Sequence, residues 1–140
     1  MSFYFYLLLT VLFWGAAPIF DKIVLRSLSP VLATMMRSIL LATMFTGFVF
    51  ASGQAKGLLA LNWRLLGLIA VAGLMGGGLG QVTYYLALKS ERAALVVPLA
   101  AAYPVVTMLL GVSLLGEALS LIRAVGVLLL VAGVVLVRLG

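Results

Sequence analysis

The 140-residue sequence contains no cysteine and no histidine. Without cysteine there is no disulfide framework and no thiolate metal site. Without histidine the commonest proton shuttle and metal ligand is missing. Acidic residues are also scarce, and three Asp and Glu in total leave acid–base or metal-assisted catalysis almost no groups to use. We therefore expect neither an enzyme, nor a metal site, nor a cofactor.

Charge of either sign is rare along the whole chain. Charged residues make up 9% of the sequence, where a soluble domain has about 25%. The sequence is 66% hydrophobic, with a mean hydropathy of +1.34. The net charge of +6 would suggest nucleic acid in a soluble protein. Here the basic residues lie singly near the ends of apolar runs, which suits lipid headgroups, so we expect a bilayer partner and no nucleic acid.

Five apolar segments are long enough to cross a bilayer, since a membrane helix needs about 20 mainly apolar residues. They span residues 3–20, 31–50, 65–88, 93–115 and 119–139. The connections are short and carry charges or Gly, Pro and Ser, so no room remains for a soluble domain. The predicted fold is an all-α integral membrane protein, with five transmembrane helices in a single domain over residues 1–140. The first segment lacks a basic n-region, so we interpret it as a mature helix and not as a signal peptide.

The charges in the connections give two interpretations of orientation. Five spans place the termini on opposite sides of the membrane. One side receives three basic residues and the other receives five, a weak bias under the positive-inside rule. The chain therefore has either a fixed topology set by a small majority, or a dual topology in which copies insert both ways. The two sets are Lys56, Arg64 and Arg123 on one side, and Lys22, Arg26, Lys89, Arg92 and Arg138 on the other.

Several weak motifs occur in a fixed order along the chain. The first is LFWGAAPIFDKIVLRSLSP, a Trp-Gly followed by a Lys and a Ser-Pro, and SPVLATMMRSILLA then places an Arg after the Pro. Next comes YYLALKSERAALVVPLAAAYPVVTMLLGVSLLGEALS, and AVGVLLLVAGVVLV closes the chain. In this order and spacing the sequence resembles the EamA domain of the drug/metabolite transporter superfamily over nearly all its length.

The resemblance implies a membrane transporter, an exporter or exchanger of small metabolites, amino acids or drug-like amphipathic molecules, in the cell membrane and expected in a prokaryotic inner membrane. Most family members carry two such domains as inverted repeats, whereas this sequence has one five-helix unit. A single repeat supplies half of a cavity at the repeat interface. We therefore expect an antiparallel homodimer, with a parallel dimer or a heterodimer with a sister chain as alternatives. A lipid-linked flippase subunit and an isolated half of a ten-helix transporter are the alternative functions.

Polar and proline residues inside the spans are the candidates for a substrate cavity, because polar groups at membrane depth are costly. Trp14, Pro18 and Asp21 share one helix face, and Pro18 frees the carbonyl of Trp14. Arg37 lies roughly 10 Å into the second span. It is either an anchor for an anionic substrate group, a tie to free carbonyls, or a side chain that reaches the headgroups. The region LFWGAAP lacks the acid that related small multidrug transporters use, so cation export by their mechanism is not expected.

The fourth span has Pro98 and Pro104, with Tyr103 and Thr107 one turn apart beside them. The prolines either reflect the ordinary frequency of Pro in membrane helices or mark a cavity wall. Glu117, just before the last span, is either a cap for the next helix or a proton-coupling group. Asp21, like Glu117, is interpreted as a cap at the membrane interface, with coupling as the alternative.

The third span has a glycine-rich run, VAGLMGGGLGQVTYY. It lacks the dinucleotide-binding fingerprint, because Gln81 stands where the last glycine would be. Inside a bilayer we expect it to stay mainly helical, with glycines that let other helices approach closely. Gln81, Tyr84 and Tyr85 share a face one turn further on and offer hydrogen bonds and rings to a substrate. The predicted packing glycines are Gly73, Gly76, Gly77 and Gly80 here, and Gly126 and Gly133 in the last span.

Overall fold

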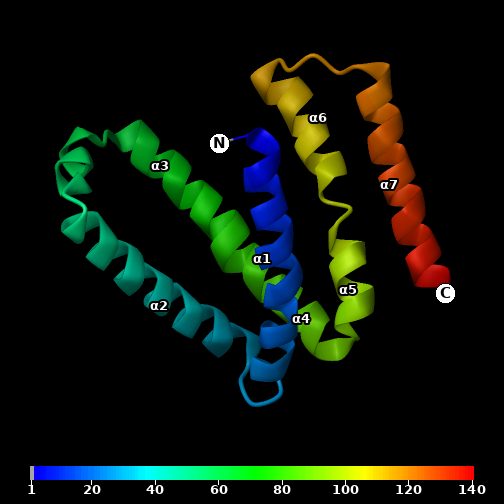
Figure 1. The fold of residues 1–140 in the computed structure, drawn as a ribbon, viewed down its shortest axis with the longest axis horizontal. Coiled ribbons are helices and arrows are strands. Elements are labelled where there is room, and N and C mark those ends of the chain that lie inside the picture. The colour runs from blue at the N-terminus through cyan, green and yellow to red at the C-terminus, as the bar shows by residue number, and fades with distance from the viewer. Residues whose placement is uncertain (1) are drawn as a thin grey trace. The chain divides into compact units, whose positions relative to one another are not determined.

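The computed structural model describes residues 2–140, and every regular element in them is helical (Figure 1). The elements α3, η2 and α4 form one span over residues 63–90, and α5 with α6 forms another over 93–115, so five helices are long and apolar enough to cross a membrane. The prediction of an all-α protein with five membrane-spanning helices is confirmed. The elements are α1 (Phe3–Val24), α2 (Pro30–Ala51), the 3₁₀ helix η1 (Gln54–Ala60), α3 (Trp63–Ala72), the π-helix η2 (Gly73–Leu79), α4 (Gly80–Ser90), α5 (Ala93–Ala100), α6 (Pro104–Leu115) and α7 (Leu121–Leu139).

The first helix runs four residues beyond its predicted end at Phe20, because the stop signal comes later in the chain. Helix α1 continues through Pro18 to Val24. The next helix then starts at Pro30, where proline is favoured as the first helical residue, and the Ser29 Oγ accepts a hydrogen bond from the Leu32 N–H at 3.2 Å. Asp21 and Lys22 consequently lie in the last turn of a helix and not in a connection.

The glycine-rich run folds as the π-helix η2 between two α-helical stretches. The Gly80 N–H bonds to the Met75 carbonyl, five residues back. A Cβ atom at Gly80 would overlap that same carbonyl oxygen, so the π-turn requires glycine there. At Gly73, Gly76 and Gly77 a Cβ would meet no described atom within 4 Å beyond the chain neighbours and the nearby backbone of the same helix. Their predicted role in contacting another helix is therefore not fulfilled within one copy and stays a prediction.

The fourth span is interrupted between its two prolines (Figure 1). Pro104 has no N–H to bond the Ala100 carbonyl, and the Tyr103 N–H bonds that carbonyl instead, at 3.1 Å. The Ala102 N–H bonds the Leu99 carbonyl at 3.2 Å in the same tight pattern. The backbone of the interruption thus stays hydrogen-bonded, as the bilayer interior demands.

The chain divides into two compact units, residues 2–90 and residues 91–140. In the first unit α4 contacts both α1 and α2. In the second unit α7 lies beside α5 and α6 (Figure 1). Most apolar side chains of both units are exposed, which suits helices that face lipid or another chain. The buried apolar residues are Leu25, Ala33, Tyr85 and Leu88 in the first unit and Val96 in the second.

Candidate functional site

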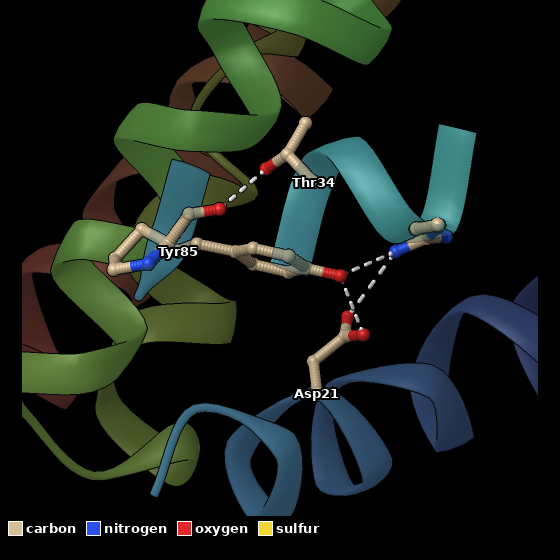
Figure 2. Close-up of polar contacts among 5 residues, drawn as sticks. Asp21, Thr34 and Tyr85 are labelled. Carbon is tan, nitrogen blue, oxygen red and sulfur yellow. Dashed lines mark hydrogen bonds and ion pairs between the residues drawn. The ribbon is translucent and has the colours of Figure 1, made fainter. Parts of the chain in front are cut away.

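Three helices of the first unit bring Asp21, Arg37 and Tyr85 together, and we call these residues the polar cluster. The Arg37 Nη1 lies 3.4 Å from the Asp21 Oδ2 and donates to the Tyr85 hydroxyl oxygen at 3.0 Å. The Tyr85 hydroxyl donates to the Asp21 Oδ1 at 2.7 Å (Figure 2). The three side chains therefore form a closed triangle that joins α1, α2 and α4.

The polar cluster lies inside the spans, near one end of all three helices. Arg37 follows the start of α2 by seven residues, a rise of roughly 10 Å, while Asp21 and Tyr85 precede the ends of α1 and α4 by three and five residues. A lone arginine at the membrane centre costs on the order of 3 kcal/mol. The carboxylate and the phenol offset part of that cost by pairing with the guanidinium.

Exposure differs sharply within the polar cluster. Tyr85 is 2% exposed, and the Asp21 side chain is 17% exposed. The Arg37 side chain is 42% exposed. Arg37 is therefore the most exposed member of the polar cluster.

Beside the polar cluster, Thr34 is buried in the first turns of α2. Its hydroxyl donates to the Pro30 carbonyl at 2.9 Å, so it has a local partner and is not free to bind a substrate (Figure 2).

Two lysines donate hydrogen bonds to backbone carbonyls at the helix ends next to the polar cluster. The Lys22 ammonium donates to the carbonyls of Leu88 and Lys89, and the Lys89 ammonium donates to the Leu28 carbonyl at 3.0 Å. Leu88 and Lys89 lie in the last turn of α4, where carbonyls lack partners within the helix. The charge pattern assigns Lys22 to the residues that set topology. In the structure Lys22 also bonds to α4, and Asp21 accepts a hydrogen bond from Tyr85 on the same helix.

The other residues predicted in the first unit differ in their exposure. Gln81 and Tyr84 are half-buried on α4, and the Tyr84 ring centroid is 6.2 Å from that of Tyr85. Pro18 is buried, whereas Trp14, on the same helix face by sequence, is 67% exposed.

The second unit contains a groove of about 460 Å³ between α6 and α7. Its polar groups are one carboxylate, one guanidinium, a phenol and a threonine hydroxyl, and the rest of its lining is mostly apolar. The Thr107 hydroxyl is directed to the Tyr103 carbonyl at 3.4 Å. Five residues singled out in the sequence line this groove, namely Tyr103, Pro104, Thr107, Glu117 and Gly126. Its lining residues are Tyr103, Pro104, Thr107, Met108, Val112, Glu117, Ala118, Leu119, Arg123, Gly126, Val127 and Leu130.

Glu117 reaches this groove because the chain turns back at the end of α6. Gly116 has φ +66°, a left-handed conformation that favours glycine, and the Glu117 N–H then bonds the Gly111 carbonyl at 3.1 Å. The carboxylate lies over Gly111, where an added Cβ would be 2.9 Å from its Oε2. The cap of α7 is not Glu117 but Ser120, whose Oγ accepts from the Arg123 N–H at 3.3 Å.

Sequence reasoning missed Gly111 and Arg123. The spacing of six residues between Gly111 and Glu117 carries no helical signal, because the left-handed turn at Gly116 lies between them. The sequence predicts Arg123 to be a topology charge, whereas in the structure it lies in the first turn of α7 and lines the groove beside α6.

The profile of the EamA-like transporter family matches residues 1–139. The chain belongs to this family. A relative from Sinorhizobium sp, described as an uncharacterized transporter in the cobO 3' region, is 30% identical over 135 residues. The match covers 96% of this EamA-like chain and 95% of the relative, so the relative has nearly the same length. No solved structure matches the chain.

Family membership and the five apolar helices make this chain a multi-pass membrane protein. They support membrane transport of small molecules as its function, and they point to a transporter and not to an enzyme.

Proposed function

We propose that this EamA-like chain exports or exchanges small molecules that join a charged group to an apolar body, such as amino acids, other metabolites or drug-like amphipathic compounds. The observation that carries the proposal is the half-exposed Arg37 in the polar cluster, inside the membrane span. A charged residue at membrane depth is costly, which makes it a candidate for function. Arg37 keeps 42% of its side chain exposed, which supports contact with a polar ligand.

The groove of the second unit supports the same substrate type. Glu117 and Arg123 give it charges of both signs, and Tyr103 gives it an aromatic surface. The remaining lining is mostly apolar, so the groove suits a small zwitterionic or amphipathic molecule and not a highly hydrated ion.

We further propose that two five-helix units work together, as an antiparallel homodimer in the first instance. Exposed glycines in η2 and at Gly126 and Gly133 leave open space that a second chain can enter. The polar cluster is open on the Arg37 side, as expected for half of a cavity. The transporter from Sinorhizobium sp has the length of one such unit, which supports a transporter built from separate chains.

The test is uptake by liposomes that contain the purified protein. We expect saturable uptake of at least one compound from a panel of amino acids and quaternary amines. Gln81→Ala and Tyr84→Ala should stay folded and slow this uptake, because both residues are half-buried beside the polar cluster without carrying its hydrogen bonds. Protein-free vesicles are the control for leakage. Folded protein that moves no compound of the panel contradicts the proposal, and selective movement of a lipid-linked sugar supports the flippase alternative.

A further inference from the structure

The groove between α6 and α7 carries both of its charges at one end. Glu117 lies in the connection that follows α6, and Arg123 lies in the first turn of α7. This connection joins two membrane-spanning helices, so it lies where the spans leave the hydrocarbon. The charged end of the groove is therefore at the level of the lipid headgroups.

Both charges are available to a ligand. Among the residues that the structure describes, Glu117 forms no ion pair and its carboxylate accepts no hydrogen bond. The Arg123 guanidinium has one long hydrogen bond, from Nη1 to the Ala118 carbonyl at 3.4 Å. Both residues are exposed. The groove thus presents one negative and one positive group, with a net charge of zero.

Below the charges the groove follows the two helices for about the depth of one leaflet. On α7 the lining reaches Leu130, nine residues after the helix start, a rise of roughly 14 Å. On α6 it reaches back to Pro104, eleven residues before the helix end, or roughly 16 Å. One leaflet contributes about 15 Å of hydrocarbon. The length of the groove and the position of its charges therefore match a phospholipid, with its headgroup at the connection and its acyl chain along the helices.

We propose that this groove binds a zwitterionic phospholipid with a primary ammonium group, the class of phosphatidylethanolamine. Arg123 pairs with the phosphate, and Glu117 accepts from the ammonium, which has three N–H donors. Phosphatidylcholine has no N–H donor for Glu117, and phosphatidylglycerol has no ammonium. The inference goes beyond the proposed transport function, because lipid binding is measured without transport.

The experiment uses the full chain in phosphatidylcholine vesicles that contain a small fraction of a phospholipid with a photoreactive diazirine on its acyl chain. Mass spectrometry after irradiation maps the label to residues. We expect the phosphatidylethanolamine probe to label α6 and α7 about 10-fold more than phosphatidylcholine or phosphatidylglycerol probes with the same chain, the scale of a charge-assisted hydrogen bond.

Two substitutions separate the contributions of the charges. Glu117→Gln should bring labelling by phosphatidylethanolamine close to that by phosphatidylcholine. Arg123→Gln should lower labelling by all three probes, because each has a phosphate. Glu91→Gln and Arg138→Gln, the same changes outside the groove, should leave the labelling unchanged.

A competition with the wild type alone guards against misfolded variants. Unlabelled phosphatidylethanolamine should displace the probe from α6 and α7, whereas the same amount of phosphatidylglycerol should not. Equal labelling by the three probes, or a preference that survives Glu117→Gln, overturns the inference, because the lipid would then be in ordinary contact with the helices. No label in the groove also overturns it and shows that protein covers this surface. A lack of substrate uptake by the same vesicles would contradict the transport function and leave the lipid site standing.

Discussion

At the scale of single residues, the stability of the first unit depends on how the Arg37 charge is compensated. The guanidinium has one carboxylate and one phenol oxygen within reach, and both come from other helices. Loss of either partner leaves a charged or polar group in the span with fewer bonds. The loss of both charges together leaves no unpaired charge, so the effects of the two kinds of substitution on stability should differ.

We therefore expect Asp21→Ala to destabilise the protein by about 1–2 kcal/mol, a value below that of a fully buried pair because Arg37 is partly exposed. The double variant Asp21→Asn with Arg37→Gln should be less damaging. Thermal unfolding in detergent measures both. If the double variant melts at the temperature of Asp21→Ala or below, the Arg37–Asp21 pair is not what stabilises this region.

The members of the polar cluster were predictable one by one, but their association was not. Arg37 and Asp21 stand out as charged residues inside apolar runs, and Tyr85 follows the glycine-rich run. Which of them meet depends on the rotation of α1, α2 and α4 about their axes. Spans that are apolar on all sides carry little information on that rotation, because no polar face marks the outside.

At the scale of helices, two glycines at η2 differ in why glycine is present there. Gly80 is required by the backbone itself, since the Met75 carbonyl occupies the space of a Cβ atom. Gly77 has open space around it in one copy of the chain. The sequence predicted a helix with close-packing glycines, but the π-turn was not predictable, because it follows from backbone hydrogen bonds and not from a repeating pattern.

This difference predicts opposite effects of the same substitution. Gly80→Ala should destabilise the protein or straighten the π-turn, because the Met75 carbonyl would have to move away from the new Cβ atom. Gly77→Ala should be neutral or stabilise by up to about 1 kcal/mol, as alanine favours a helix over glycine. Unfolding temperatures of the two variants side by side measure the contrast. Equal effects would show that the π-turn does not govern the choice of Gly80.

The five spans themselves followed from length and hydropathy, because membrane thickness sets the length of a helix. The predicted ends of the helices were less accurate where capping residues or prolines determine where a helix starts or stops. Helix α1 continues to Val24 because the Ser-Pro signal comes at Ser29, and the fourth span is interrupted because Pro104 cannot donate to Ala100.

At the scale of the whole molecule, orientation and pairing decide the function. Five basic residues on one side against three on the other give a weak topological preference. An antiparallel pair needs both orientations to occur in the membrane. In the proposed antiparallel pair, the exposed glycines would meet a second chain, and the open side of the polar cluster would face it.

We expect a reporter group at the C-terminus to be accessible from both sides of the membrane in comparable amounts. Gly77→Leu should impair pairing more than it impairs the folding of single chains, because its side chain would fill space that is open within one copy. Labelling of sealed membranes and cross-linking measure the two effects. C-termini on one side alone would contradict the antiparallel arrangement.

The central claim is that one five-helix chain supplies half of a transport site. The most direct test counts fluorescently labelled chains in single vesicles by photobleaching and records substrate flux in the same vesicles. The account predicts flux in vesicles that hold two or more chains and none in vesicles that hold one. Flux in single-chain vesicles at the same rate per chain would contradict it.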